Sequence, residues 1–119
     1  MLEVKRGYIF MANLPFLGGS IQDGIHPVVV VSNEKCNTHS PVISVVSFTS
    51  QEKPHIPTHI YVGKEGNGLT KDSTALCEQI LTINKDCLIE FMGICHPSDL
   101  LRIEQGMKIQ LGLVNKYVD

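Results

Sequence analysis

The sequence predicts a mainly β domain, in which an antiparallel sheet is curled or closed as a small barrel and one C-terminal helix packs against it. Three observations support this fold class. Four consecutive valines, Val28 to Val31, follow Pro27, and β-branched residues favour strands over helices. Further short apolar or alternating segments are separated by stretches rich in glycine and proline. Apolar residues recur with helical spacing only near the C-terminal end.

The valine run predicts a central strand buried on both faces, with Pro27 as its first residue, where no ladder donor is needed. Gly24 allows the chain to turn into this strand, and His26 is expected directly before its first residue. By the same patterns, strands are predicted at residues 8–12, 27–31, 42–49, 58–62, 73–83 and 88–94. Polar connections are predicted at 14–25, 34–41, 50–57 and 63–68, and a connection as long as 14–25 is often a binding loop or a mobile one.

The C-terminal helix is predicted to begin at Pro97, which suits the first helical position. A pair of opposite charges four residues apart, Glu104 and Lys108, is expected on its surface. Gly106 weakens the helix by about 1 kcal/mol relative to alanine, so packing must compensate. The predicted buried face consists of Leu100, Ile103, Met107, Leu111 and Val114.

Composition narrows the functional classes. The 119 residues suit a single domain, 1–119, and a formal net charge of −2 gives no general attraction to nucleic acid. The chain begins without the apolar region of a signal peptide and has no 18-residue apolar run, which predicts a cytoplasmic location. The four cysteines lack C-x-x-C spacing, so three small core residues and one loop residue are expected, with no metal and no cofactor.

Few side chains suggest chemistry by themselves. His55 and His59 are four residues apart, but Pro57 between them excludes the helical face that paired zinc ligands use. Glu78 interrupts an apolar strand, so it either faces solvent or has a partner or a role. His26 is either a surface histidine or a proton-transfer group suited to neutral pH. Thr49, followed by Ser50 and Gln51, is either an ordinary strand-end turn or a cluster of polar ligands.

Six segments carry recognisable motifs: residues 6–10 (RGYIF), 24–33 (GIHPVVVVSN), 48–50 (FTS), 57–59 (PTH), 71–83 (KDS followed by CEQILTI) and 109–113 (IQLGL). Together, and in this order, they resemble the MazF/PemK (Kid) family of toxin endoribonucleases. The resemblance implies an SH3-like, CcdB-type small barrel that works as a homodimer and is neutralised by a cognate antitoxin protein. It also implies metal-independent cleavage of single-stranded RNA, in which the 2′-hydroxyl attacks the adjacent phosphate to give a 2′,3′-cyclic phosphate and a 5′-hydroxyl.

The resemblance assigns catalytic roles to His26 and Thr49, and RNA-binding or site-holding roles to Gln22, Ser50, Gln51, Glu78 and Gln79. Three positions depart from the family pattern. His26 replaces the arginine of G-x-R-P, Ile21 replaces a frequent glutamate, and Leu81 replaces the arginine of Q-x-R-T-I.

These departures leave three hypotheses. In the first, histidine replaces arginine as the acid or base, although it stabilises phosphate charge less well. This hypothesis predicts greatest activity on the acidic side of neutral pH, where the imidazolium form is available. A second hypothesis is a degenerate homologue that binds RNA or an antitoxin peptide without cleavage. A third is a CcdB-like toxin that blocks a protein target through the end of its helix.

Overall fold

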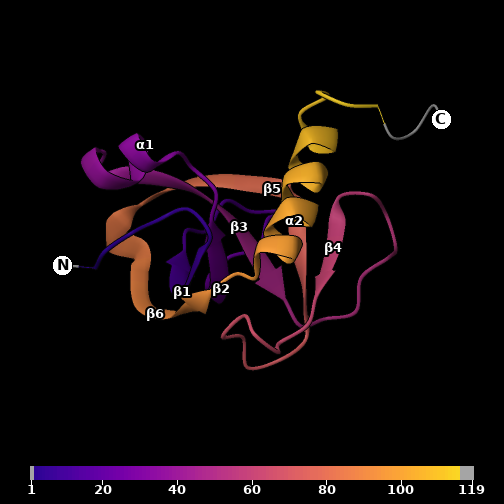
Figure 1. Ribbon diagram of the computed structural model, residues 1–119, viewed down its shortest axis with the longest axis horizontal. Coiled ribbons are helices and arrows are strands. Elements are labelled where there is room, and N and C mark those ends of the chain that lie inside the picture. Colours follow the sequence, from indigo (N-terminus) through magenta and orange to yellow (C-terminus); the bar gives the residue numbers. More distant parts are fainter. Residues whose placement is uncertain (1, 116–119) are drawn as a thin grey trace.

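The computed structural model of the protein describes residues 2–115, and in this part of the chain it contains one six-stranded sheet and two α-helices (Figure 1). The elements follow in the order β1 (Tyr8–Leu14), β2 (Gly24–Val30), α1 (Glu34–His39), β3 (Val42–Thr49), β4 (His59–Val62), β5 (Ser73–Asn84), the 3₁₀ turn η1 (Lys85–Cys87), β6 (Leu88–Ile94) and α2 (Pro97–Gln110). All six predicted strands and the C-terminal helix are therefore confirmed.

The sheet has the strand order β4-β5-β3-β2-β1-β6, and every neighbouring pair is antiparallel. The edge strands β4 and β6 do not pair with each other among the described residues, so the sheet stays open instead of closing into a barrel. Helix α2 lies across β4 and β5 on one side of the sheet (Figure 1).

Strand β2 is central, and Val28, Val29 and Val30 are all fully buried. Their side chains alternate between two apolar cores, one on each face of the sheet, as a strand buried on both faces requires. The strand begins at Gly24, three residues before the predicted start at Pro27. The additional residues pair only with β1, whereas pairing with β3 begins at Val28.

Helix α1 was predicted as part of a polar connection, and that prediction was wrong. The side chain of Asn33 caps the helix by accepting a hydrogen bond from the backbone N–H of Cys36 at 2.9 Å. The Asn37 side chain is buried and donates to the Ser32 carbonyl and the Glu34 carboxylate. Six residues are too few to show helical periodicity, so the cap was the only local signal.

Helix α2 begins at Pro97 as predicted, and Leu100, Ile103 and Met107 join the core beneath it. The helix ends at Gln110, and for this reason Leu111 and Val114 lie beyond it and are exposed, contrary to the prediction.

The predicted pair of Glu104 with Lys108 is also replaced. Glu104 instead binds Arg6, from the segment before β1, with 2.6 Å between the charged groups. Cys77 and Cys95 are buried and the partly exposed Cys87 packs against a core, so three cysteines join the cores as predicted, whereas Cys36 lies on helix α1 instead of on a loop. No helix among residues 2–115 is long and apolar enough to span a membrane.

Candidate functional site

The two predicted catalytic residues lie at the same end of neighbouring strands. The last residue pair of β2 and β3 is Val28 with Ser47, and His26 and Thr49 each lie two residues beyond it. Side chains alternate along a strand, so both residues continue the row formed by Val28 and Ser47. The sheet thus brings together two residues that are 23 positions apart in the sequence.

Thr49 lies on the wall of a pocket of about 420 Å³. Its side chain is nearly buried, and its hydroxyl oxygen accepts a hydrogen bond from the backbone N–H of Gln51 at 3.2 Å. Because the hydroxyl is the acceptor in that bond, its own hydrogen is available to a ligand. The pocket is formed by the 49–55 segment and by the adjoining ends of β4 and β5: Thr49, Ser50, Gln51, Glu52, Lys53, Pro54, His55, His59, Tyr61, Asp72, Ser73 and Thr74.

Gln22 occupies a gap in the hydrogen-bond ladder between β2 and β3. Hydrogen-bonded pairs occur at every second residue of an antiparallel ladder. In this ladder they are counted from Val31, whose N–H donates to the Ser44 carbonyl. Two steps further, Pro27 would face Phe48 but has no N–H to donate. Instead, the Gln22 side-chain amide donates to the Phe48 carbonyl at 2.9 Å and to the Ser47 hydroxyl at 3.0 Å.

Gln79 fastens the same loop to β5. Its side-chain oxygen accepts from the Gln22 backbone N–H at 2.8 Å, and its side-chain nitrogen donates to the Ser20 carbonyl at 3.1 Å. Both polar atoms of the Gln79 side chain are therefore used within the protein. The structure places Gln22 and Gln79 in one contact that holds the C-terminal half of the loop at the ends of the strands.

An irregularity in β5 creates this arrangement. Val46 of β3 pairs with Ile80, but Phe48, two residues later, pairs with Ala75. Strand β5 therefore carries three more residues than β3 over this interval, and Glu78 and Gln79 lie among them. Such irregularities redirect side chains out of the regular alternation, which explains two adjacent polar residues between the apolar stretches of this strand.

Glu78 has a partner, His59, that the sequence did not identify. One carboxylate oxygen, Oε2, lies 3.0 Å from His59 Nε2, and the other, Oε1, is buried without a hydrogen-bond partner among the described residues. His59 Nδ1 lies 3.0 Å from the Pro54 carbonyl oxygen. A polar residue inside an apolar strand was the available signal for Glu78, but its partner lies 19 residues away on another strand.

His26 does not line the Thr49 pocket. Its side chain is partly exposed, and no hydrogen bond to the ring occurs within residues 2–115. Ser50 and Gln51 are exposed at the pocket rim. The structure thus groups Thr49, Ser50 and Gln51 together and places His26 on the neighbouring strand end.

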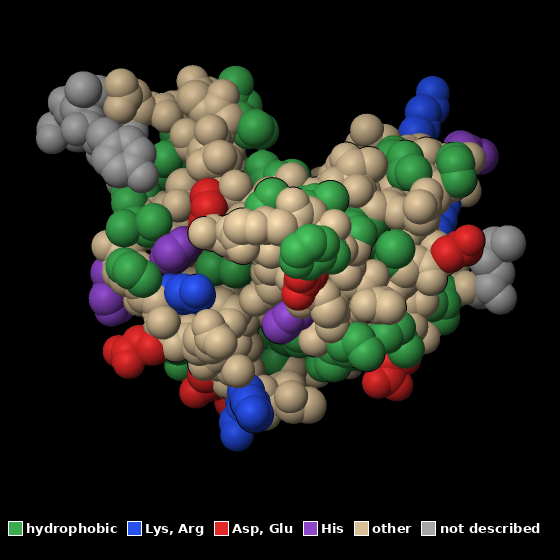
Figure 2. All heavy atoms as spheres, turned by 180° about the vertical axis from the view of Figure 1, so that it is seen from behind, with side chains coloured by type: hydrophobic (Ala, Val, Ile, Leu, Met, Phe, Trp, Pro, Cys, Tyr) green, Lys and Arg blue, Asp and Glu red, His purple; other side chains and the backbone are tan. Residues whose placement is uncertain are grey.

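The electrostatics of the pocket are mixed. The Lys64 backbone N–H donates to Asp72 at 2.9 Å, and this bond, followed by one from the Tyr61 hydroxyl, lowers the pKa of Asp72. The hydrogen bond between Tyr61 and Asp72 also raises the pKa of Tyr61. On the face shown in Figure 2, acidic and basic side chains are scattered without a continuous basic surface.

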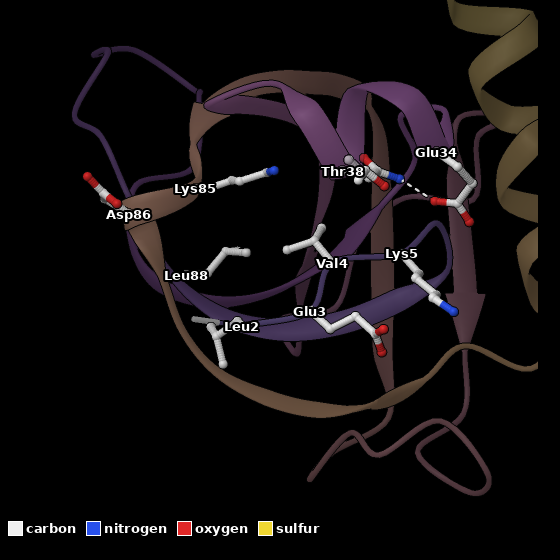
Figure 3. A pocket seen from close by; sticks show the side chains of 10 residues that line it. Leu2, Glu3, Val4, Lys5, Glu34, Thr38, Lys85, Asp86 and Leu88 are labelled. Carbon is white, nitrogen blue, oxygen red and sulfur yellow. Dashed lines mark hydrogen bonds between the residues drawn. The ribbon is translucent and has the colours of Figure 1, made fainter.

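A larger pocket, of about 780 Å³, lies elsewhere, between the N-terminal segment, α1 and η1 (Figure 3). Its walls include Val4, Glu34 and Lys85 but none of the predicted site residues. Convergent polar groups, more than volume, therefore favour the Thr49 pocket as the functional site.

The strand order, the C-terminal helix and the polar strand ends define a small antiparallel β protein with its site at one end of the central strands. Comparison with known families gives a more specific class: residues 5–111 match the family described as PemK-like, MazF-like toxin of type II toxin–antitoxin systems. The chain belongs to this family.

Individual relatives agree with this assignment. The chain is 36% identical to Endoribonuclease MazF of Staphylococcus epidermidis over 113 residues, which cover 94% of each protein. It resembles a mycobacterial endoribonuclease solved in complex with its cognate antitoxin, with a TM-score of 0.77, 26% identity, and coverage of 92% of this chain and 95% of the other. It also shares the fold of MazF from Deinococcus radiodurans, with a TM-score of 0.82 at 17% identity, over 94% of this chain and 99% of the other.

Proposed function

We propose that this toxin is an endoribonuclease that cleaves single-stranded RNA without a metal ion, producing a 2′,3′-cyclic phosphate and a 5′-hydroxyl. The activity corresponds to the name of the Staphylococcus relative, which is an endoribonuclease. In this reaction the nucleophile is the ribose 2′-hydroxyl of the substrate. The protein therefore has to orient the phosphate, stabilise its charge and move two protons.

The proposal rests mainly on the state of the Thr49 hydroxyl in the structure. Its hydroxyl hydrogen is not used by the bond from Gln51, and the side chain is held nearly buried at the pocket wall. A donor fixed in this way can bind a non-bridging phosphate oxygen without first reorganising, which favours the transition state as charge accumulates there.

His26 is assigned the proton transfer. As a base, its imidazole would accept the proton of the 2′-hydroxyl while the 2′-oxygen forms its bond to phosphorus; as an acid, it would protonate the departing 5′-oxygen. Its partly exposed ring makes no hydrogen bond within the described residues, so it can contact substrate directly. The imidazolium form also supplies a positive charge, which accounts for the expectation of greatest activity on the acidic side of neutral pH.

The remaining predicted residues divide into two groups. Ser50 and Gln51 are exposed at the rim and are assigned to RNA contact. Gln22, Glu78 and Gln79 form hydrogen bonds within the protein, so their role is to hold the site in shape.

We extend the proposal to partners. A cognate antitoxin would occupy the RNA groove through a segment that folds on binding, in keeping with the mycobacterial endoribonuclease that was solved with its antitoxin. The toxin would act as a homodimer in the cytoplasm, and sedimentation as a monomer at micromolar concentration would contradict the dimer.

The test is cleavage of a long single-stranded RNA in EDTA between pH 5 and 9. Wild type should give discrete fragments with cyclic-phosphate ends. His26→Ala and Thr49→Val should each lower the rate by roughly 100-fold or more, since proton transfer and a positioned oxyanion donor are each worth that much. Thr49→Ser, which keeps the hydroxyl, should retain most activity.

His39→Ala is the matched control, because His39 is exposed on α1, away from the site, and its loss should leave cleavage unchanged. Full activity of His26→Ala would move the proton transfer to another group. Absence of cleavage by wild type at every pH would favour the degenerate binder.

A further inference from the structure

We infer that His59 is a positioning residue, which fixes the 50–57 wall of the Thr49 pocket to strand β5 and does not itself transfer a proton during RNA cleavage. The inference rests on the proposed function and assigns a role to a residue outside the predicted site. Its physical basis is the set of contacts around one imidazole ring.

The ring bridges two elements. His59 is the first residue of β4, and its side chain is only 9% exposed. On one side, Nδ1 faces the carbonyl oxygen of Pro54, in the middle of the 50–57 segment; on the other, Nε2 faces Glu78 on β5. The ring is therefore the side-chain link between this segment and the strand behind it.

The chemistry of the partners determines the role of each ring nitrogen. A backbone carbonyl only accepts hydrogen bonds, so Nδ1 must carry a hydrogen. If Glu78 is ionised, Nε2 donates to it; if Glu78 is protonated, Nε2 accepts from it. In both cases one hydrogen lies between Nε2 and Oε2, and both ring nitrogens are occupied. A ring in this state has no free nitrogen with which to exchange a proton with substrate.

The segment that His59 holds has few other restraints. It contains Pro54 and Pro57, so it cannot join a regular ladder. The backbone N–H of Gln51 is bound to Thr49 at the start of the segment, and near its end Ile56 N–H donates to the Pro54 carbonyl. Pro54 thus receives both a local bond and the bond from the His59 ring. The Ile56 carbonyl accepts from the His59 backbone N–H at 2.9 Å, so the ring bond is the side-chain contact that fastens the middle of the segment to the sheet.

Glu78 completes the link. The β5 irregularity turns this carboxylate towards His59, and its second oxygen is buried without a partner in the described residues. A buried acceptor left in this way is costly. The compensating interaction is the His59 contact, which makes the loss of His59 more disruptive at Glu78 than the loss of an ordinary surface histidine.

Two amide substitutions separate the two contacts. The side-chain nitrogen of asparagine can take the place of Nδ1, and that of glutamine the place of Nε2. His59→Asn should keep the bond to Pro54, whereas His59→Gln should keep the bond to Glu78 and release the segment. His39→Ala is the control, because His39 is an exposed histidine on α1 and does not line the pocket.

Steady-state cleavage distinguishes positioning from proton transfer. For His59→Ala and His59→Gln we expect KM to rise roughly tenfold with kcat changed less than about threefold, since the wall that contacts RNA is displaced while the reacting groups stay in place. His59→Asn should recover near-wild-type KM, and His39→Ala should match wild type. A fall in kcat shared by all three His59 variants would overturn the inference, because it would indicate direct participation in the chemistry.

Amide hydrogen exchange gives a readout that does not depend on activity. In His59→Ala and His59→Gln, amides of residues 50–57 should exchange faster, while those of β1 and β2 keep wild-type protection and so show that the variant is folded. Unchanged exchange in 50–57 would overturn the inference. If wild type does not cleave RNA, the proposed function fails, and the exchange experiment still decides whether His59 holds the segment.

Discussion

Gly106 lies where helix α2 contacts the sheet, and it is buried. A Cβ atom at this position would lie 2.8 Å from the Cys77 sulfur and 3.2 Å from a side-chain carbon of Ile60. The helix therefore approaches β4 and β5 closely because residue 106 has no side chain. The sequence indicated that this glycine had to be compensated by packing, and the structure confirms that it is.

Gly106→Ala is expected to destabilise the protein, although alanine is the better helix former. The helix gains about 1 kcal/mol in propensity, but forcing a methyl group against a packed core costs about 1–3 kcal/mol. The net effect in urea unfolding should be a loss of up to about 2 kcal/mol. Gln105→Ala, on the exposed side of the helix, is the control and should change stability little.

A double-mutant cycle with Cys77→Ala identifies the clash. Removing the sulfur should make Gly106→Ala less damaging than it is in the wild-type background, since the two sites are in contact. If Gly106→Ala proved neutral or stabilising, the close approach would not limit packing.

At the scale of the elements, the connection between β1 and β2 is long but held in place. Gln79 of β5 accepts from Gln22 N–H and donates to the Ser20 carbonyl, while the Gln22 side chain donates to β3. The sequence allowed either a binding loop or a mobile one. These contacts favour a loop that is fastened at its C-terminal half.

Gln79→Ala should release this half of the loop. Two hydrogen bonds are lost, each worth about 1 kcal/mol, so global stability should fall by roughly 1–2 kcal/mol. The larger effect should be local, with faster hydrogen exchange at the Gln22 amide. Thr82→Ala, an exposed change on the same strand, is the control, and unchanged protection of Gln22 would show that Gln79 does not hold the loop.

At the scale of the whole molecule, the segment before β1 connects distant parts of the fold. The Arg6 backbone N–H donates to Glu34 at the start of α1, and the Arg6 guanidinium binds Glu104 of α2 and the carbonyl of Val31. Hydrogen bonds from Asn37 and then from Arg6 lower the pKa of Glu34 below 4.5. The ionised form of Glu34 therefore stabilises the folded state.

This shift predicts how stability depends on pH. Because the pKa of Glu34 is lower in the folded protein, its contribution is present above pH 4.5 and is lost as the pH falls through the folded value. Glu34→Gln should unfold at a lower urea concentration than wild type at pH 7. The difference should shrink steadily below pH 4.5, and a difference that is independent of pH would contradict the assignment.

The thiols of Cys77 and Cys95 show a different whole-fold effect. Burial, and secondarily the charge of Glu78, raises the pKa of Cys77 to about 12, and burial with Asp99 raises that of Cys95 to about 11. Both thiols stay protonated at neutral pH and act as small core groups.

Much of this protein was determined by local sequence. The valine run, the alternating segments and Pro97 predicted six strands and one helix, because strand and helix preferences depend on neighbouring residues. The same local motifs, through their family resemblance, identified the toxin family. The strand-end position of Thr49 could also be predicted, since Thr49 directly follows an apolar run.

Only the tertiary structure decided which side chains meet. Glu104 bonds to Arg6 instead of Lys108, Glu78 finds His59, and Gln79 finds Gln22, and each of these partners lies far away in the sequence. The pairings depend on strand order and on an irregularity in β5 that local preference does not encode. The open edge of the sheet has the same origin, because closure depends on how distant strands pair and not on the tendency of any one segment to be extended.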